Sequence, residues 1–318
     1  MSEPFLVGLI GARGHTGREL LRLIGGHPDL MLAYASSREF AGRPVSEIAP
    51  EDHDGCVFEA LTPDAAAPRR ADVVILATPD GAAGSFVTAF DRDAPQRILI
   101  DLSADYRFDN DWAYGLPELY RDRIFDKTRI ANPGCYATAM QLALAPLIEF
   151  SGTRPSCFGV SGYSGAGSTP SPRNNIERLT DNLMPYALTG HKHEREVSHH
   201  LGRPISFTPH VHPAFSGLLI TAHIPLKDKM TSQDIASIYE AKYGDEHLIA
   251  LRNVAPELKD GTGRKGVMIG GFEVSEDGRS AVVISAEDNL LKGAAIQAIQ
   301  NVNLALGLPE LMGITDSV

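Results

Sequence analysis

Cysteine is scarce in this chain, and long apolar runs are missing from it. Its three cysteines, Cys56, Cys135 and Cys157, are an odd number with wide spacings, which excludes a disulfide framework and a CxxC metal site. No apolar run approaches the roughly 20 residues that span a bilayer, and the first residues lack the basic segment that opens a secretory signal. We therefore expect a reduced, cytoplasmic protein that takes no membrane as a partner.

Basic residues are also in deficit. The 318-residue chain has 29 Lys and Arg against 40 Asp and Glu, a formal net charge of -11, and it contains no run of Lys or Arg. A nucleic-acid partner would need a basic face that overcomes this field, so none is expected. With 43% hydrophobic and 22% charged residues, the composition is that of a globular protein. At about 150 residues per domain, the length predicts two domains.

The N-terminal part of the chain alternates short apolar runs with helix-like stretches. The runs that predict buried strands occupy residues 5–10, 30–35, 72–77 and 97–102. Residues 17–24 predict the helix that follows the first of them. This alternation is typical of βαβ units, in which a mostly parallel sheet carries helices on both faces. The expected fold class is therefore α/β, with a Rossmann-type dinucleotide-binding domain over residues 1–134.

The pattern changes after about residue 155, where longer strands are expected. They occupy residues 205–211, 217–225, 267–274 and 281–286. The turn-rich residues 275–279 join the last two as a hairpin. Hairpins imply a mixed or antiparallel sheet, so residues 135–286 are expected to form a second, α+β domain. Residues 291–306 have helical periodicity and end at Gly307, a residue type that commonly follows a helix.

A glycine-rich loop follows the first predicted strand directly and opens the first helix. Glycines let a pyrophosphate approach the backbone closely, and the N–H groups and dipole of a helix favour its negative charge. The spacing is GxxGxxG instead of the usual GxGxxG, so the loop matches by its position in the chain. The alternative is a glycine-rich turn that binds no ligand. The residues assigned to cofactor binding in this loop are Gly11, Arg13, Gly14, His15, Thr16 and Gly17.

The end of the second predicted strand selects between the two nicotinamide cofactors. NAD sites usually carry an Asp or Glu there, which accepts a hydrogen bond from the ribose 2′-OH. This chain has Ser36, Ser37 and Arg38 instead. Hydroxyls and a guanidinium match the charge of a 2′-phosphate, so we predict NADP as the cofactor. The alternative is that Arg38 is an ordinary exposed loop arginine.

One cysteine stands at the start of a predicted helix. Pro133 and Gly134 form a turn that places Cys135 in the first turn of a helix over residues 137–144. Unpaired N–H groups and the helix dipole lower the pKa of a thiol there. A shift from about 8.5 to about 6.5 would raise the thiolate fraction at pH 7 from roughly 3% to roughly 75%. We predict that Cys135 is a nucleophile; the alternative is a small core residue, as expected for the other two cysteines.

A nucleophilic cysteine needs a partner for proton transfer. His191 and His193 are the candidates, with the cation Lys192 between them available to an anionic substrate. The density of histidines also allows a metal site, because His191/His193 and His210/His212 are both HxH pairs. However, the chain has no HExxH motif and no carboxylates at ligand spacing around these pairs. No metal is therefore expected.

Three further residues are candidates for binding the substrate or its phosphate. Ser103 and Arg107 follow the end of a predicted parallel strand, where α/β sheets bind ligands. In a chain of negative net charge, a phosphate-bearing substrate needs such a local cation. Asn132, shortly before Cys135, is assigned to the same site. The alternative for Arg107 is an exposed ion pair.

These motifs together resemble the N-acetyl-γ-glutamyl-phosphate reductase family over essentially the whole chain. The same two-domain plan and cysteine at a helix start are shared by the aspartate-semialdehyde dehydrogenase superfamily. The motifs that carry the resemblance are GARGHTG at 11–17, SSR at 36–38, DLSADYR at 101–107, YGLPE at 114–118, ANPGCY at 131–136, GVSGYSGAG at 159–167, GHKHE at 190–194 and DNLLKGAA at 288–295.

The resemblance implies roles for several residues. Cys135 would form a thioacyl enzyme, His193 or His191 would transfer protons, and Arg107 would hold the leaving phosphate. The nicotinamide side of the cofactor site would be lined by Ser164, Gly165 and Asn289. Residues 135–286 would be the catalytic and dimerisation domain, and the C-terminal helix, within residues 287–318, would return to the first domain. The protein is expected to be a homo-oligomer, either a dimer or a tetramer.

The implied reaction is NADPH-dependent reductive dephosphorylation of an acyl phosphate, N-acetyl-L-glutamyl 5-phosphate, in arginine biosynthesis. One departure concerns the histidines: the commoner form of the family has His-Arg-His followed by Pro-Glu, whereas this chain has His191-Lys192-His193-Glu194-Arg195-Glu196. This leaves open which histidine acts and which cation meets the substrate carboxylate. The alternative functions are a sister reductase of aspartyl or aminoadipyl phosphate, a metal hydrolase that uses the histidines, and a non-catalytic NADP sensor.

Overall fold

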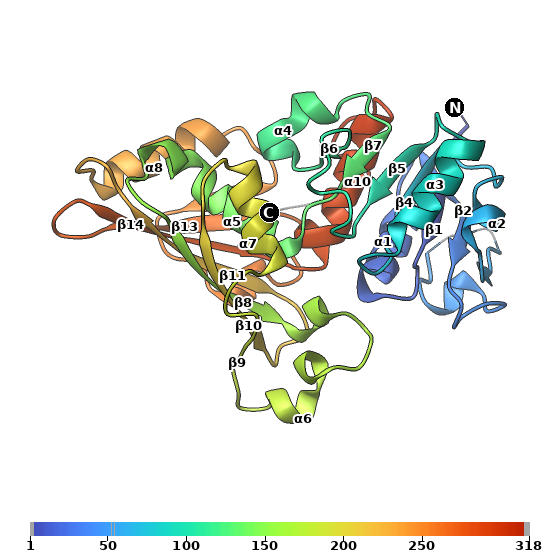
Figure 1. Ribbon diagram of the computed structural model, residues 1–318, viewed down its shortest axis with the longest axis horizontal. Helices are drawn as coiled ribbons and strands as arrows, with labels where there is room; N and C mark the ends of the chain where they lie inside the picture. Colours follow the sequence, from blue (N-terminus) through green and yellow to red (C-terminus); the bar gives the residue numbers. More distant parts are fainter. Residues whose placement is uncertain (1–2, 52, 54, 315–318) are drawn as a thin grey trace. The chain divides into compact units, whose positions relative to one another are not determined.

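The computed structural model describes residues 3–51, 53 and 55–314. The chain divides into two compact units (Figure 1). Unit 1 comprises the described residues of Met1–Pro133 and Ala294–Thr315, and unit 2 comprises Gly134–Gly293. Among the described residues, each unit is built on a seven-stranded sheet. The α/β fold class with a second, mixed sheet is therefore confirmed.

The sheet of unit 1 has the strand order β3-β2-β1-β4-β5-β7-β6, and all of its pairings are parallel. This is the doubly wound arrangement of Rossmann folds, in which the order reverses beside the first strand. The strands are β1 (Phe5–Ile10), β2 (Leu30–Ser36), β3 (Phe58–Glu59), β4 (Val73–Leu76), β5 (Ile98–Asp101), β6 (Ala113–Tyr114) and β7 (Arg129–Ala131).

Helices flank this sheet and explain its continuous apolar strands. β4 reads VVIL and is buried at every position, as expected when helices cover both faces of a parallel sheet. α1 packs against β2 and against α10, whereas α2 and α3 pack against each other (Figure 1). The helices of unit 1 are α1 (His15–Gly25), the 3-10 helix η1 (Val45–Glu47), α2 (Pro63–Ala66), α3 (Ala83–Asp93), α4 (Pro117–Ile124) and α10 (Ile296–Ala305).

The carboxyl ends of the central strands are in register with one another. Paired residues form one row across the sheet, namely Ser36, Ile10, Leu76, Asp101 and Ala131. The cofactor loop, the Ser36–Arg38 turn and the 101–107 segment all begin at or just beyond this row. Because parallel strands end at the same edge, the sheet gathers these segments at the position where such folds bind ligands.

The sheet of unit 2 has the order β12-β13-β14-β11-β8-β10-β9 and is mixed. The pairs β8–β10 and β12–β13 are parallel, and the other pairs are antiparallel. The expected hairpin is present between β13 and β14. The strands are β8 (Ser156–Gly162), β9 (Met184–Pro185), β10 (Ser206–His212), β11 (Leu218–Pro225), β12 (Ile249–Arg252), β13 (Val267–Val274) and β14 (Ser280–Glu287).

Helices α5 and α8 pack against this second sheet, and α7 packs against α5. Side chains along β11 alternate between buried and half-exposed positions, so one face of the sheet forms the core under these helices. The helices of unit 2 are α5 (Cys135–Leu144), the 3-10 helices η2 (Ala145–Phe150), η3 (Tyr163–Ala166) and η4 (Pro172–Asn174), α6 (Ile176–Leu179), α7 (Lys192–His200), α8 (Ser232–Tyr243) and α9 (Leu258–Gly261).

The C-terminal helix differs from the uninterrupted helix expected over residues 291–306. It begins with a π-helical turn, η5 (Leu291–Ala295), and continues as α10. The carbonyl oxygen of Asp288 accepts hydrogen bonds from the N–H groups of both Leu291 and Gly293, at 3.2 and 3.0 Å, which widens this turn. Such turns frequently occur at functional sites. The helix ends as predicted, because Gly307 follows Leu306 with a φ of 69°.

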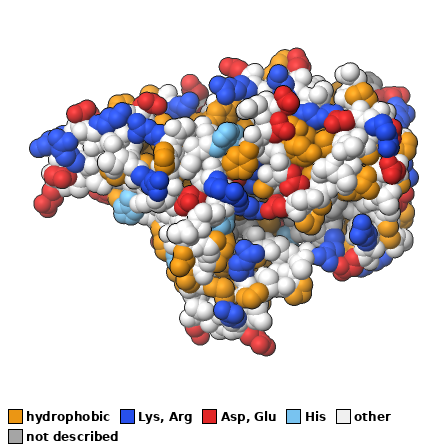
Figure 2. Space-filling model, in the orientation of Figure 1, with side chains coloured by type: hydrophobic (Ala, Val, Ile, Leu, Met, Phe, Trp, Pro, Cys, Tyr) orange, Lys and Arg blue, Asp and Glu red, His pale blue; other side chains and the backbone are white. Residues whose placement is uncertain are grey.

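Two features of the molecule bear on the predicted partners. None of the helices formed by the described residues combines the length and apolar character that a bilayer crossing requires. Figure 2 shows one face of the molecule, on which Lys and Arg side chains are interspersed with Asp and Glu side chains. Over the described residues drawn there, no continuous basic surface of the kind that binds a phosphate backbone is present.

The close packing of α1 on the cofactor loop makes Gly17 a test of unit 1. A β-carbon at Gly17 would lie 2.7 Å from the carbonyl carbon and oxygen of Ala12. We expect Gly17→Ala to lower the free energy of unfolding by about 1–3 kcal/mol, as overpacking against rigid backbone does. Urea denaturation followed by the fluorescence of Trp112, the only tryptophan of the chain, reports on this unit.

The matched control is Gly14→Ala, because a β-carbon at Gly14 has no neighbour nearer than 4.0 Å. Its free energy of unfolding should stay within about 0.5 kcal/mol of the wild-type value. Equal stability of Gly17→Ala and the wild type would contradict the packing described here.

Candidate active site

The glycine loop is pinned to two neighbouring strands of unit 1. Gly11 has a φ of 88°, and a β-carbon there would lie 2.2 Å from the carbonyl oxygen of Ala77, just beyond β4. Only glycine fits this position. The N–H groups of Gly11 and Ala12 both donate to the carbonyl oxygen of Ser36, at 3.1 and 3.0 Å. These bonds bring the loop against the turn that follows β2.

The N-terminus of α1 has the properties of an anion site. Its first turn contains His15, Thr16 and Gly17, and the N-cap residue is Gly14, which contributes no capping side chain. No acidic residue lies in this first turn. An α-helix leaves its first N–H groups without intrahelical partners, and its dipole places positive potential there. The loop therefore fits the pyrophosphate of a dinucleotide.

The turn after β2 presents hydroxyls and one guanidinium. Ser36 and Ser37 are buried, and their hydroxyl oxygens accept hydrogen bonds from the N–H groups of Leu61 (3.3 Å) and Phe40 (3.2 Å). A hydroxyl that accepts still has its own proton to donate. Arg38 is exposed. These groups fit a phosphate on the ribose better than they fit a bare 2′-hydroxyl.

One residue of the glycine loop forms an ion pair that the sequence did not reveal. Arg13, assigned to the cofactor loop, pairs with Glu39 of the next turn. Both side chains are largely exposed, so this pair adds little to stability. It holds the Arg13 side chain alongside the turn that carries Arg38.

Ser103 and Arg107 lie at the end of β5, and both are buried. The Ser103 hydroxyl donates to Asp101 at 2.7 Å. Burial raises the pKa of Asp101 to about 6. The Arg107 guanidinium donates to the carbonyl oxygens of Asn132 (2.9 Å) and Leu102 (2.8 Å). Arg107 is therefore no exposed ion-pair residue; it ties the end of β5 to the segment that leads to Cys135.

The amide of Asn132 is held by the C-terminal helix. Its oxygen accepts from Asn301 of α10 at 2.9 Å, and its nitrogen lies 3.4 Å from the carbonyl oxygen of Ala294. Asn301 and Gln297 also donate to the carbonyl oxygen of Gly115, at 3.0 and 2.6 Å. The returning helix therefore fixes the backbone just before the cysteine.

Cys135 is the first residue of α5, and Gly134 is its N-cap. The Gly134 N–H donates to the carboxylate of Glu196 on α7, at 3.0 Å, and Glu196 is buried. Cys135 itself is partly exposed. By contrast, burial raises the pKa of Cys157 to about 12. Of these two thiols, only that of Cys135 combines accessibility with the helix position that favours a thiolate.

His193 lies on the side of α7 that faces the start of α5. It precedes Glu196 by three residues, and residues at this spacing share a helix face. Its ring lies 6.0 Å from that of Tyr136, the residue after Cys135 (centroid to centroid). The contacts of Tyr136 and Glu196 therefore bring His193 and Cys135 into one cluster.

His191 occupies a different role, as the N-cap of α7. Its Nδ1 accepts a hydrogen bond from the His193 N–H at 3.1 Å. Burial and the neighbouring Lys192, Arg173 and Arg195 lower the pKa of His191 to about 4. The imidazole is therefore neutral at pH 7, and one of its two nitrogens is already used by the backbone.

Gly293 brings a buried carboxylate next to the cysteine. A β-carbon at Gly293 would lie 2.7 Å from Cβ of Cys135 and 2.8 Å from a carboxylate oxygen of Glu287. Glu287, at the end of β14, is fully buried. The absence of a side chain at Gly293 is what allows this π-helical turn to pack against the first turn of α5.

Ser164, Gly165 and Asn289 form a second cluster in unit 2. The Asn289 amide donates to the Ser164 hydroxyl at 2.9 Å and accepts from the Gly217 N–H at 3.0 Å. A β-carbon at Gly165 would lie 3.7 Å from the same amide. The structure thus joins two motifs that are distant in the sequence.

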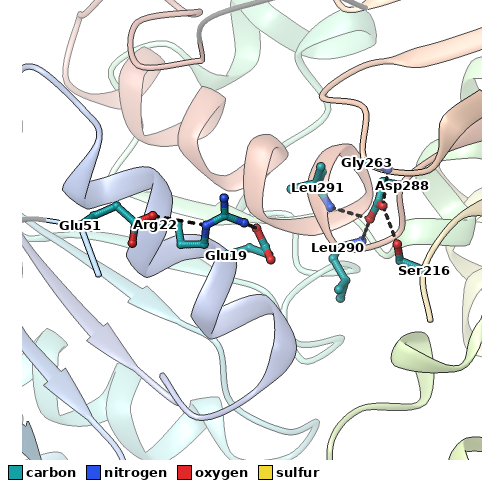
Figure 3. Close-up of polar contacts among 8 residues, drawn as sticks. All are labelled: Glu19, Arg22, Glu51, Ser216, Gly263, Asp288, Leu290 and Leu291. Carbon is teal, nitrogen blue, oxygen red and sulfur yellow. Dashed lines mark hydrogen bonds and ion pairs between the residues drawn. The ribbon is translucent and has the colours of Figure 1, made fainter. Parts of the chain in front are cut away.

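Asp288 anchors the loop that carries this cluster (Figure 3). Its carboxylate accepts from the Ser216 hydroxyl and the Gly263 N–H, both at 2.8 Å, and from the N–H groups of Leu290 (2.8 Å) and Leu291 (3.3 Å). Figure 3 also shows Arg22 of α1 between Glu19 and Glu51, an exposed ion-pair group of unit 1.

Sequence analysis gave no role to several residues of the candidate site. Three of them, Tyr136, Asp288 and Gly293, stand inside motifs that carry the family resemblance. The others, Arg173, Glu196 and Glu287, stand outside those motifs, and only their contacts in the folded chain single them out. Among the described residues, no group of three or more His, Cys, Asp and Glu is placed to hold a metal ion.

The capping role of His191 predicts a pH dependence of stability. The pKa of His191 is about 4 in the folded protein, below the ordinary 6.5. The unfolded chain therefore binds more protons between these values, so the stabilisation is complete above about pH 6.5 and is lost as the pH falls towards 4. His191→Asn keeps a capping acceptor and removes the titration. We expect its urea midpoint to fall less than that of the wild type between pH 7 and pH 4.5.

The control for this experiment is His247→Asn, because His247 is exposed and lies in a turn outside the strands of the sheet. Its pH dependence should match that of the wild type. A wild-type-like pH dependence of His191→Asn would show that His191 is charged in the folded protein.

Comparisons with known proteins agree with this arrangement. The family model "Semialdehyde dehydrogenase, NAD binding domain" matches residues 6–127, and "Semialdehyde dehydrogenase, dimerisation domain" matches residues 135–289. Among solved structures, aspartate semialdehyde dehydrogenase II of Vibrio cholerae, complexed with ASA, aligns with a TM-score of 0.76 at 17% identity, over 96% of this chain and 99% of that one. The enzyme of Candida albicans with NADP aligns with a TM-score of 0.73 at 16% identity, over 95% and 98%. At these identities the likeness shows the fold alone.

Curated relatives are much closer in sequence. N-acetyl-gamma-glutamyl-phosphate reductase of Xanthomonas axonopodis pv. citri (strain 306) is 53% identical over 98% of this chain and 99% of its own length. The protein of the same name from Stenotrophomonas maltophilia (strain R551-3) is 51% identical over 98% of each chain. The resemblance inferred from the motifs is thereby confirmed: the chain belongs to the N-acetyl-gamma-glutamyl-phosphate reductase family.

Proposed function

We propose that the protein reduces N-acetyl-L-glutamyl 5-phosphate to N-acetyl-L-glutamate 5-semialdehyde and phosphate, with NADPH as the reductant, in arginine biosynthesis. One observation carries this proposal: a partly exposed Cys135 begins α5, beside a helix that presents His193. The names of the close relatives supply the acyl group.

Unit 1 would hold the cofactor. The Gly11–Gly17 loop and the uncapped start of α1 fit the pyrophosphate, and Ser36, Ser37 and Arg38 fit the 2′-phosphate. Ser164, Gly165 and Asn289 are proposed for the nicotinamide side. When bound, NADPH supplies the hydride that reduces a thioester to the aldehyde level.

The first step belongs to Cys135. Its thiolate, favoured by the N-terminus of α5, attacks the acyl carbonyl carbon. A C–S bond forms, the bond from this carbon to the phosphate oxygen breaks, and inorganic phosphate leaves. The product is a thioester on Cys135, which accepts hydride far more readily than a carboxylate does.

His193 would transfer the proton of the thiohemiacetal oxygen in the step that releases the semialdehyde. It protonates the oxygen of the thiohemiacetal on Cys135, and then takes that proton back as the C–S bond breaks and the semialdehyde leaves. His191 is unsuited to this role because its pKa is lowered to about 4 and its Nδ1 accepts from the backbone. We therefore assign the transfer to His193 and the capping of α7 to His191.

The phosphate group would be met by cations and N–H or hydroxyl donors. Lys192 is the first residue of α7, next to His193. Ser103, Arg107 and Asn132 remain assigned to phosphate or substrate binding. Two carbonyl oxygens already engage Arg107, so it would act with its backbone contacts in place.

Unit 2 would also assemble the oligomer. The match of its sequence to a dimerisation domain supports a homo-oligomer. Phe158 of β8 and His223 of β11 are exposed on this sheet. We propose a dimer or tetramer formed through this unit.

The requirement for phosphate tests the mechanism. In the reverse direction, oxidation of the semialdehyde stops at the thioester unless phosphate releases the acyl group. NADPH formation should therefore depend on phosphate, and Cys135→Ser should reduce kcat by at least about 10³-fold, as loss of a covalent nucleophile does. Cys157→Ser is the control and should retain most of the activity. Full activity without phosphate, or in Cys135→Ser, contradicts the proposal.

The choice of cofactor is tested at Arg38. Arg38→Ala should raise KM for NADPH about tenfold or more and leave KM for NADH nearly unchanged, because only NADPH carries the 2′-phosphate. Steady-state kinetics with both cofactors measures this ratio. Arg43→Ala, an exposed arginine paired with Glu47, is the matched control. Equal effects on NADPH and NADH would remove Arg38 from the cofactor site.

A further inference from the structure

The substrate named by the proposed function carries a carboxylate at the end opposite its phosphate. A carboxylate taken from water needs a charged or hydrogen-bonding partner, and none of the residues considered so far serves it. The candidates lie around His191, because three cations, Lys192, Arg173 and Arg195, act on this residue. They differ in how each is held.

Arg173 is linked to the cysteine cluster by a series of contacts between neighbouring rings. Its guanidinium lies over the ring of Tyr186, 5.0 Å from the ring centre. The Tyr186 ring contacts the His191 ring edge to face, with 5.5 Å between the ring centroids. The His191 ring in turn contacts the His193 ring edge to face, with 4.9 Å between the centroids. Burial raises the pKa of the Tyr186 phenol, Cys135 raises it further and Arg173 lowers it, so Tyr186 lies within electrostatic reach of both residues.

The segment that carries Arg173 is built firmly. Ser171 and Asn174 form a capping box around η4, with a hydrogen bond of 2.7 Å from the Ser171 N–H to the Asn174 amide oxygen. The Asn174 amide also donates to the carbonyl oxygens of Gly167 and Thr169, both at 2.8 Å. η4 packs against η3, which contains Ser164. The backbone on both sides of the arginine is therefore fixed.

The guanidinium of Arg173 has donors to spare. One hydrogen bond joins it to the Tyr186 phenol, and because a guanidinium carries five N–H groups, others remain for the oxygens of a carboxylate. Within the described part of the chain, no acidic side chain forms an ion pair with Arg173, whose side chain is exposed. A positive charge oriented by an aromatic ring and lacking a protein carboxylate is suited to a ligand carboxylate.

The other two cations fit less well. Lys192 is the first residue of α7 and is a point charge without the planar geometry that matches a carboxylate. Arg195 is exposed and lies two residues after His193, off the helix face shared by His193 and Glu196.

We propose that Arg173, stacked on Tyr186, binds the carboxylate of the substrate and so determines which acyl phosphates reach Cys135. This inference rests on the proposed function for the identity of the substrate. Its physical content is independent of turnover: a carboxylate attached to a group that reacts with Cys135 is attracted by Arg173.

A matched pair of alkylating reagents tests this attraction without any catalysis. N-iodoacetylglycine and its uncharged amide both react by forming a C–S bond at Cys135 while the C–I bond breaks and iodide leaves. In the first reagent, the carboxylate is separated from the reacting carbon by the same number of bonds as in N-acetylglutamyl phosphate. The rate at Cys135 is measured by peptide mass spectrometry, which separates it from reaction at Cys56 and Cys157.

The wild type should prefer the carboxylate reagent over the amide. Arg173→Met, which keeps an unbranched apolar stem but removes the guanidinium, should lower this ratio of rates about tenfold, and Arg173→Lys should restore part of it. Arg178→Met removes an exposed arginine of the neighbouring helix α6 and should leave the ratio unchanged. An unchanged ratio in Arg173→Met, or an equal fall in Arg178→Met, would overturn the proposal.

Steady-state kinetics then separates this inference from the proposed function. With N-acetylglutamyl phosphate, Arg173→Met should raise KM about tenfold or more and change kcat little. If the wild type does not turn over this substrate, but the reagent preference still depends on Arg173, the proposed function fails and the carboxylate site stands. If turnover is normal in Arg173→Met and the reagent ratio is unchanged, the site fails and the function stands.

Discussion

The hydrogen bond from the Gly134 N–H to the Glu196 carboxylate is the contact on which the arrangement of the candidate site in unit 2 depends. It joins the residue before Cys135 to the helix that carries His193. Because Glu196 is buried, breaking the bond would leave a charge without one of its partners, which is costly in the protein interior. Gly293 reinforces the arrangement from the other side, since any side chain there would displace Cys135 or Glu287. The cysteine is thus accessible but not free to move.

In unit 1, strand register and backbone hydrogen bonds position the candidate cofactor loop. The row of paired residues from Ser36 to Ala131 ends the central strands at one level, and backbone hydrogen bonds then fasten the glycine loop to Ser36. The buried Arg107 donates to the carbonyl oxygen of Asn132, and Asn301 of the C-terminal helix donates to the Asn132 amide oxygen. These two contacts hold the segment that precedes Cys135. Backbone groups and glycines make most of these contacts, so a short sequence motif is enough to specify them.

The start of α7 is surrounded by positive charges, although the chain as a whole is negative. The formal net charge is -11, yet three cations lie near His191: burial first, and then Lys192, Arg173 and Arg195, lower the pKa of its imidazole. The same local field favours a thiolate and an anionic substrate. His191 and His193, two residues apart, have different surroundings, because His191 caps a helix with its ring nitrogen and His193 faces the cysteine cluster.

Local patterns in the sequence were enough for the α/β class, the glycine loop, the helix that starts at Cys135 and the hairpin before Glu287, since each depends on neighbours in the chain. β8 escaped notice because its residues SCFGVSG are poor strand formers, and pairing with β10 and β11 makes it a strand. The positions of Glu196, Gly293 and Arg173 near the residues around Cys135 could be seen only in the folded chain, because they arise from contacts between distant segments. Burial and the field of distant cations decided the protonation of His191, and neither quantity exists until the tertiary structure forms.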